Sequence, residues 1–152
     1  MRQSHQEGGP TPIHLVGLSA FPLTPLRDDV VDECAFIGLV ERLTAAGVDS
    51  ITALGSTGSY AYLTPAERAR VARLAVEYAG STPVFIGVGD LRTSHVLAHV
   101  DSAEKAGAAG VLLAPMTYQP LTDDDVFRLF RTVIEHTDLP VIVYDNPGTT
   151  HF

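Results

Sequence analysis

The 152-residue sequence has little cysteine, little lysine, few basic residues overall and no long hydrophobic run. Cys34 is the only cysteine, so no intrachain disulfide can form, and a reducing compartment, the cytoplasm, is expected. The 10 Lys and Arg residues stand against 18 Asp and Glu residues, a net charge of −8. This balance argues against binding nucleic acid or an anionic membrane surface through a basic face. No apolar run is long enough to span a bilayer.

The length of the chain is enough for one hydrophobic core but short for two domains. Residues 1–12 are polar and contain Gly and Pro, which predicts a flexible N-terminal tail and one folded unit over residues 13–152. Cys34 could be a nucleophile, but it lies at the start of an apolar helical run. We therefore expect a buried structural thiol there.

Apolar runs of strand length alternate with longer stretches of helical period. The strand-length runs are nearly all apolar, as in parallel strands covered on both faces. The expected strands are Leu15 to Ala20, Ser50 to Leu54, Val84 to Val88, Gly110 to Ala114 and Val141 to Tyr144. The expected helices are Asp32 to Ala46, Pro65 to Ala79, Ser94 to Ala106 and Asp123 to Glu135.

This alternation predicts an α/β fold with a parallel sheet and right-handed crossovers. A parallel (β/α)8 TIM barrel needs eight strand-helix units and about 250 residues. The chain supplies four units and a fifth strand, so it resembles the N-terminal half of such a barrel. On the pattern alone, a doubly wound open sheet remains possible.

Two sets of residues resemble metal ligands. Asp123 to Asp125 follow Thr122 at a helix start, where carboxylates are favoured by the helix dipole, so we interpret them as capping residues. His95 and His99 have the i, i+4 spacing of a zinc pair. Without an acidic partner between them, on a helix expected to lie away from the strand ends, they are predicted to face solvent. No metal and no cofactor is therefore expected.

Functional residues in either α/β architecture follow the carboxyl ends of the strands. Gly55-Ser56-Thr57-Gly58 places two hydroxyls between two glycines directly after a strand. Backbone N–H groups and hydroxyls can converge there on a carboxylate or phosphate, although an ordinary turn would need glycine too. Tyr144 ends another strand, and its hydroxyl needs a partner, for which Ser56 or Thr57 would be suitable.

These motifs together resemble the pyruvate-dependent class I aldolases typified by dihydrodipicolinate synthase and N-acetylneuraminate lyase. The resemblance extends from about Val16 to the end of the chain. The matching stretches, one after or within each expected strand, are Ala20 to Pro25, Gly55 to Gly58, Gly87 to Gly89, Ala114-Pro115 and Tyr144 to Pro147.

The resemblance implies residue roles. Thr57 and Gly58, with the backbone around them, would bind the carboxylate of pyruvate or a related 2-keto acid, and Ser56 would join a proton relay with Tyr144. A tyrosine of the fourth-strand loop completes that relay in the family, and here Thr117 or Tyr118 stands near its place.

The family forms a Schiff base between a lysine and the keto group. That lysine belongs to a sixth strand, beyond Phe152, and the only lysine here is Lys105, on a helix in water. The chain as given is thus expected to lack the Schiff-base lysine and to be inactive alone. Thr149 stands where dihydrodipicolinate synthase has an arginine, which favours another 2-keto acid branch.

Three hypotheses follow from the sequence. The first is half of a Schiff-base aldolase or lyase that acts on a small 2-keto acid. The alternative is a non-catalytic half-barrel or interaction module that associates through an unpaired strand edge, so a homo-oligomer is expected. A nucleotide-binding domain is a weaker hypothesis, because Arg92 occupies the place of the third glycine of the dinucleotide motif.

Overall fold

The structure is a computed structural model that describes residues 15–150, with the side chains of 149 and 150 not described. The tail predicted over residues 1–12 lies outside the described residues, as does the side chain of Thr149.

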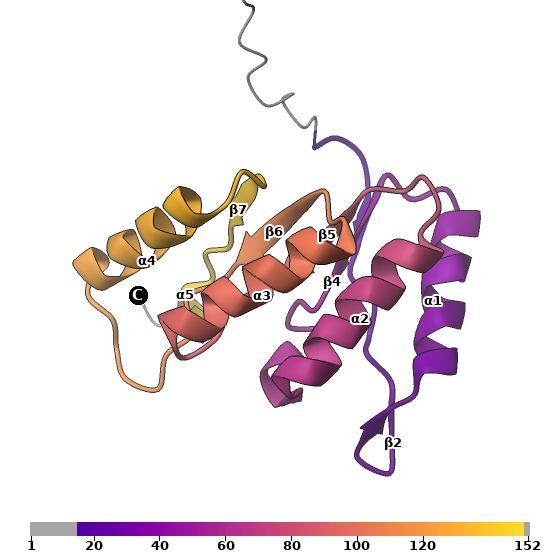
Figure 1. Ribbon diagram of the computed structural model, residues 1–152, viewed down its shortest axis with the longest axis horizontal. Helices are drawn as coiled ribbons and strands as arrows, with labels where there is room; N and C mark the ends of the chain where they lie inside the picture. The colour runs from indigo at the N-terminus through magenta and orange to yellow at the C-terminus, as the bar shows by residue number, and fades with distance from the viewer. Residues whose placement is uncertain (1–14, 151–152) are drawn as a thin grey trace, which may run out of the picture.

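One five-stranded parallel sheet forms the centre of the fold (Figure 1). Its strands are β1 (Ser19–Ala20), β4 (Ser50–Ala53), β5 (Val84–Gly87), β6 (Gly110–Leu113) and β7 (Val141–Val143), in the order β1-β4-β5-β6-β7. Each strand pairs with its predecessor in the sheet in parallel, and the strand order follows the chain order. A doubly wound sheet reverses its strand order, and this one does not. The order is that of one half of a (β/α)8 barrel.

Four long helices connect the strands and cover one face of the sheet (Figure 1). They are α1 (Glu33–Ala45), α2 (Pro65–Tyr78), α3 (Thr93–Ala106) and α4 (Asp123–His136), and the short α5 (Pro147–Thr150) follows β7. Neighbouring helices pack against one another in chain order. Since each crossover helix returns antiparallel to the strands, it begins at the carboxyl edge of the sheet and ends at the amino edge.

The hydrophobic core lies between the sheet and these helices. Alternate strand residues point toward the helices and are almost fully buried, among them Ile51, Ala53, Ile86, Val111 and Leu113. The helices contribute buried stripes to the same core, which include Phe36, Val40, Val71, Ala75, Val96, Val100 and Val133. This burial supplies most of the driving force for folding.

The helix starts predicted at Pro65 and Asp123 are confirmed. The Thr64 side chain accepts a hydrogen bond from Glu67 N, and the Glu67 carboxylate accepts one from Thr64 N at 2.8 Å, which completes a capping box. Thr122 and Asp125 form the same arrangement at the start of α4. The acidic run therefore begins a helix, as the sequence predicted.

Three predictions about burial or extent are wrong. The first strand is only Ser19–Ala20, because Gly17 adopts φ +84° and its backbone approaches Asp49, whose carboxylate accepts Leu18 N at 2.6 Å. Val143 is 61% exposed, because β7 is an edge strand and not a doubly covered one. Cys34 is exposed, since the buried stripe of α1 runs through Phe36 and Val40 on another side of the helix.

Besides the short α5, two small features were not predicted. A hairpin joins β2 (Leu26–Arg27) to β3 (Val30–Val31) through Asp28 and Asp29, which both have positive φ as a tight hairpin turn requires. A 3-10 turn, η1 (Tyr60–Tyr62), precedes α2. The second of these places a tyrosine at the functional edge.

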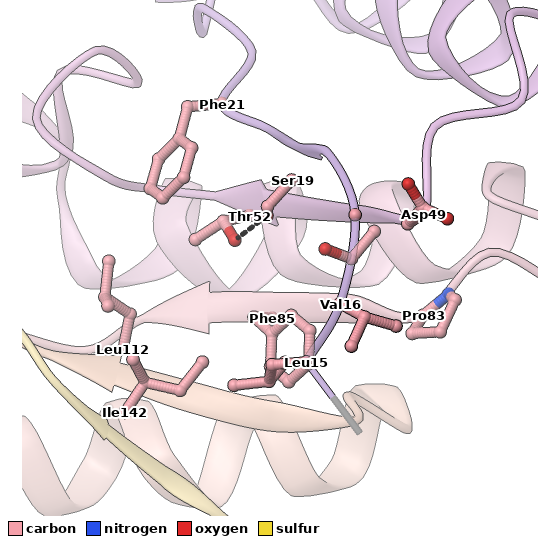
Figure 2. A pocket seen from close by; sticks show the side chains of 12 residues that line it. Leu15, Val16, Ser19, Phe21, Asp49, Thr52, Pro83, Phe85, Leu112 and Ile142 are labelled. Carbon is pink, nitrogen blue, oxygen red and sulfur yellow. Dashed lines mark hydrogen bonds between the residues drawn. The ribbon is translucent and has the colours of Figure 1, made fainter. Parts of the chain in front are cut away.

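The sheet face opposite the helices holds a cavity of about 240 Å³ (Figure 2). Leu15 and Val16 lie across this face, near Phe85 and Pro83. Ser19 and Thr52 share a hydrogen bond of 3.0 Å on the same face. In a closed barrel such inward side chains form packed layers, so this mainly apolar cavity belongs to the barrel interior.

Candidate active site

A second, smaller cavity of about 70 Å³ lies at the carboxyl edge of the sheet. Its lining comes from the ends of all five strands of the sheet and from η1. The lining residues are Phe21, Leu54, Gly55, Ser56, Thr57, Tyr60, Gly89, Leu112, Ala114 and Tyr144. At roughly 15 Å³ per water-sized unit, the space suits a small molecule of about five heavy atoms. Three residues that the sequence singled out, Ser56, Thr57 and Tyr144, line this one cavity.

The turn after β4 presents the two hydroxyl residues. Leu54 takes the left-handed conformation, with φ +59°, and reverses the chain at the end of the strand. Gly58 N then donates to Gly55 O at 2.9 Å, so the turn closes on itself. Ser56 and Thr57 are exposed, whereas Gly58 is buried beneath them and is absent from the cavity lining. Gly58 thus shapes the turn, and Ser56 and Thr57 line the cavity.

The left-handed Leu54 fits because its neighbour on β5 is a glycine. A Cβ atom on Gly87 would lie 1.9 Å from Leu54 O, far inside any real contact. A Cβ atom on Gly89 would lie 2.6 Å from Ala114 O in the same way. Backbone strain at Leu54 is therefore held in place by close packing of the strand ends. The glycines of Gly87 to Gly89 serve this packing.

Tyr144 enters the cavity from the end of β7. Its backbone N donates to Leu113 O at 3.0 Å, which continues the ladder one residue beyond the strand. Its hydroxyl accepts a hydrogen bond from Asn146 Nδ2 at 3.2 Å. The sequence predicted Ser56 or Thr57 as the hydroxyl's partner, and the structure shows Asn146 in that role.

Tyr60 is a cavity residue that the sequence analysis missed. It lies on η1 directly after the Ser56–Thr57 turn and is half-buried. Burial raises the pKa of its phenol, the charge of Arg68 opposes this, and Tyr144 and Asp90 add to the rise. Tyr60 and Tyr144 both line the cavity, so two phenols share it. Tyr60 lies three residues after Thr57, and this short distance along the chain was the signal in the sequence that could have placed it at the cavity.

Arg68 lies behind Tyr60 and is only 3% exposed. Its Nη2 donates to Gly87 O and its Nη1 to Gly89 O, each at 3.0 Å, and its guanidinium carbon lies 5.3 Å from the centre of the Tyr60 ring. Nη1 also lies 3.5 Å from the Asp90 carboxylate. Burial lowers the pKa of Arg68 to about 10, so the side chain stays charged at neutral pH.

The Asp90 carboxylate contacts both histidines that were predicted to face solvent. His99 Nε2 lies 3.1 Å from Asp90 Oδ2, and His95 Nδ1 lies 3.2 Å from Oδ1. The prediction is wrong for His99, which is 5% exposed, and only half right for His95. The reason is that α3 begins at the carboxyl edge, and His99 belongs to its buried stripe with Val96 and Val100.

The pKa values of this group follow from its burial. Burial lowers the pKa of His99, and the charge of Arg68 lowers it further, against the opposing effect of Asp90. Burial raises the pKa of Asp90, but hydrogen bonds from His99, from the Arg92 backbone and from His95 outweigh it, so this pKa is lowered overall. At neutral pH, Asp90 is thus ionised and His99 is neutral, and the Asp90 carboxylate lies between His99 and Arg68.

The remaining candidates lie away from the cavity. Tyr118 is 93% exposed, and the Thr117 hydroxyl bonds within its own loop to the backbone of Gln119. Lys105 is exposed in the last turn of α3. That helix of 14 residues is about 21 Å long and ends at the amino edge of the sheet, opposite the cavity.

The described residues show no group of three His, Cys, Asp or Glu side chains that could hold a metal ion. Within residues 15–150, no helix is long and apolar enough to cross a membrane.

The fold and the cavity place the chain among (β/α)8 barrel proteins, whose functional sites lie at the carboxyl ends of the strands. Residues 14–152 match the sequence model of the Dihydrodipicolinate synthetase family, and the chain belongs to that family. The predicted family and fold class are both confirmed.

Relatives support this assignment. The chain is 37% identical over 129 residues to 4-hydroxy-tetrahydrodipicolinate synthase of Hyphomonas neptunium, which covers 84% of this chain and 44% of that protein. The crystal structure of dihydrodipicolinate synthase from Agrobacterium tumefaciens is 46% identical, with a TM-score of 0.86 over 90% of this chain and 46% of that one. YagE, a prophage protein of E. coli K12 solved in complex with pyruvate, is 29% identical, with a TM-score of 0.84 over 90% of this chain and 47% of its own. The chain thus spans less than half the length of these relatives.

Proposed function

We propose that this chain carries the keto-acid-binding part of a Schiff-base lyase or aldolase of the dihydrodipicolinate synthase family. One observation carries the proposal: the small cavity brings Ser56, Thr57 and Tyr144 together from two segments far apart in the sequence. The pyruvate complex of the E. coli relative supports a small 2-keto acid as the ligand. Threonine at position 149, where dihydrodipicolinate synthase has an arginine, favours a branch other than lysine biosynthesis. A cytoplasmic location fits the single cysteine.

The carboxylate of the keto acid would lie on the Ser56–Thr57 turn. Both hydroxyls and the backbone N–H groups of the turn can donate to it, without any basic side chain. Such charge-assisted hydrogen bonds are about twice as strong as neutral ones. An acidic protein can therefore bind a small anion here despite its net charge of −8.

Tyr144 would face the keto group from the other side of the cavity and pass protons during imine and carbon–carbon bond chemistry. The imine itself needs a lysine in a desolvated pocket. Lys105, the sole lysine of the sequence, is exposed at the opposite edge of the sheet. The proposal is thus that the chain alone binds the keto acid without forming the imine.

Calorimetric titration with pyruvate tests the binding. Thr57→Val keeps the shape of the side chain and removes one donor to a charged group, so we expect a loss of about 1.5–3 kcal/mol, roughly 10- to 100-fold in affinity. Thr82→Val, half-buried in the loop before β5, is the control and leaves affinity unchanged. Equal affinity in the wild type and Thr57→Val would overturn the assignment of the cradle.

Borohydride reduction in the presence of pyruvate tests the imine. We expect no covalent adduct on the 152-residue chain by mass spectrometry, and an adduct on a hybrid in which the second half of the Agrobacterium relative follows it. An adduct at Lys105 of the short chain would contradict the proposal.

A second function is favoured by the apolar surface on and beside β7. Phe127, Ile134 and Val143 are large, exposed and located at this end of the sheet. An unpaired strand edge beside exposed apolar side chains favours association, so the alternative is a homo-oligomerising half-barrel. Light scattering is expected to show an oligomer, and a stable monomer would count against this function.

A further inference from the structure

We propose that Tyr60 is a second ligand-contacting phenol, which shares the keto oxygen of the bound 2-keto acid with Tyr144, and that Arg68 positions it. This inference rests on the proposed function, because it concerns the same ligand. It assigns to η1 a role that the sequence analysis looked for in the loop of Thr117 and Tyr118. Neither of those residues lines the cavity, whereas Tyr60 does.

The position of Tyr60 follows from the turn that binds the carboxylate. Ser59 has φ +55°, and its N donates to Ser56 O at 3.1 Å, so the chain folds back directly after Thr57. The Tyr60 ring then lies against the end of β5, where a Cβ atom on Gly89 would be 3.5 Å from Tyr60 Cε2. Carboxylate-binding turn and phenol thus belong to one short segment, and Tyr144 approaches from another strand.

Two phenols suit a keto acid better than one. A carbonyl oxygen has two lone pairs and can accept two hydrogen bonds, while the carboxylate occupies the hydroxyls of the turn. The Tyr144 hydroxyl already accepts from Asn146 Nδ2, which leaves its own proton to donate. Each phenol O–H can donate a hydrogen bond to the keto oxygen, and two such bonds polarise the carbonyl carbon.

Arg68 has the features of a positioning residue and not of a ligand-binding one. It is buried, it is absent from the cavity lining, and its two terminal nitrogens are used on Gly87 O and Gly89 O. Its Nε has no hydrogen-bond partner within the described part of the chain. The free-energy cost of burying the Arg68 guanidinium is offset by the nearby Asp90 carboxylate and by the face of the Tyr60 ring. The Tyr60 ring is thus held between the Arg68 guanidinium and the backbone at Gly89.

The test is an NMR titration of the full chain labelled with carbon-13 at tyrosine Cζ, which gives one signal for each of its five tyrosines. Tyr→Phe variants assign the signals, and Tyr62→Phe, an exposed neighbour on η1, is the control. Pyruvate is expected to move the Tyr60 and Tyr144 signals together, and to leave those of Tyr62 and Tyr118 in place. Tyr60→Phe is expected to weaken pyruvate binding about tenfold, while Tyr62→Phe leaves it unchanged.

The outcomes separate the two proposals. If pyruvate moves the Tyr144 signal but not the Tyr60 signal, the role of Tyr60 is overturned and the proposed function survives. If pyruvate moves none of these signals in the wild type, both are overturned.

The role of Arg68 has its own readout. Arg68→Lys keeps a charge but loses the paired contacts to Gly87 and Gly89, so we expect the Tyr60 signal to broaden and pyruvate affinity to fall, with the Tyr144 signal unchanged. A variant that remains folded with wild-type Tyr60 signal and affinity would overturn the positioning role. If Arg68→Lys unfolds, Asp90→Asn tests the same link, since it removes the carboxylate that holds Arg68.

Discussion

Two polar groups lie next to each other at the carboxyl edge of the sheet, and they are built in opposite ways. The cavity group of Ser56, Thr57 and Tyr144 presents hydroxyls to open space. The group of Arg68, Asp90 and His99 turns its polar atoms on one another and on backbone carbonyls, largely out of contact with water. We propose that the first group binds the ligand and that the second group holds the first in shape. Tyr60 belongs to the cavity and touches both.

The comparison predicts that the buried group governs stability and the open group governs binding. Changes to Arg68, Gly87 or His99 should lower the free energy of unfolding. Changes to the hydroxyls should alter affinity at nearly constant stability.

The largest effect is expected from Arg68→Met. It leaves Asp90, Gly87 O and Gly89 O without their shared donor inside the protein, at a cost of about 3–5 kcal/mol in unfolding free energy. Urea denaturation measures this. The control on the same helix is Arg70→Met, which breaks a half-exposed pair with Glu33 and should cost no more than about 1 kcal/mol. Equal losses in both variants would erase the distinction between the groups.

Gly87→Ala should come next, at about 3 kcal/mol, because its Cβ atom would collide with Leu54 O and push the turn out of place. Pyruvate affinity should fall with stability here, unlike in the hydroxyl variants. Gly38→Ala is the matched control: nothing lies within 4 Å of the added Cβ, and the change in mid-helix should stabilise by about 0.5–1 kcal/mol. Stability unchanged in Gly87→Ala would mean that the turn does not depend on this contact.

A smaller effect is expected from pH. The pKa of His99 is lowered in the folded state, chiefly by burial, so the unfolded chain binds its proton first as pH falls. The contribution of His99 is therefore fully present above its ordinary pKa of about 6.5 and is lost as pH falls through the folded value. Unfolding curves at pH 7.5 and 5.5 should show this loss in the wild type and a reduced loss in His99→Gln.

The smallest effect is expected from Tyr118→Phe. Its ring is almost fully exposed, so stability should stay within about 0.5 kcal/mol of the wild type and pyruvate affinity should not change. A clear loss of pyruvate affinity would show that the loop of Thr117 and Tyr118 contributes to binding. It would also count against the proposed role of Tyr60.

The open group could be predicted from the sequence because parallel strands end at one edge. Residues that directly follow the second and fifth strands must then lie near each other, whatever the helices do, and Ser56, Thr57 and Tyr144 line one cavity as that rule requires. The buried group could not be predicted in this way. Arg68, Asp90 and His99 come from a helix, a loop and another helix, and no local pattern relates them.

The wrong predictions about Cys34, His95 and His99 arose because local patterns do not show how a helix packs. Periodicity marked Cys34 as apolar helix surface, but only the rotation of α1 against the sheet decides which side is buried. His95 and His99 were judged by their distance from the strand ends along the chain, whereas α3 begins at that edge in space.

By itself, the sequence determined the alternation of strands and helices, the capped helix starts, the family and the segments that meet at the carboxyl edge, because these depend on local periodicity and on short motifs. The tertiary structure alone decided that Tyr60 is a cavity residue, that Arg68 is buried behind it, and that Asp90 holds two histidines. The physical reason is that burial and side-chain partnership arise when distant segments pack, and a guanidinium or an imidazole has the same sequence letter in water and in a core.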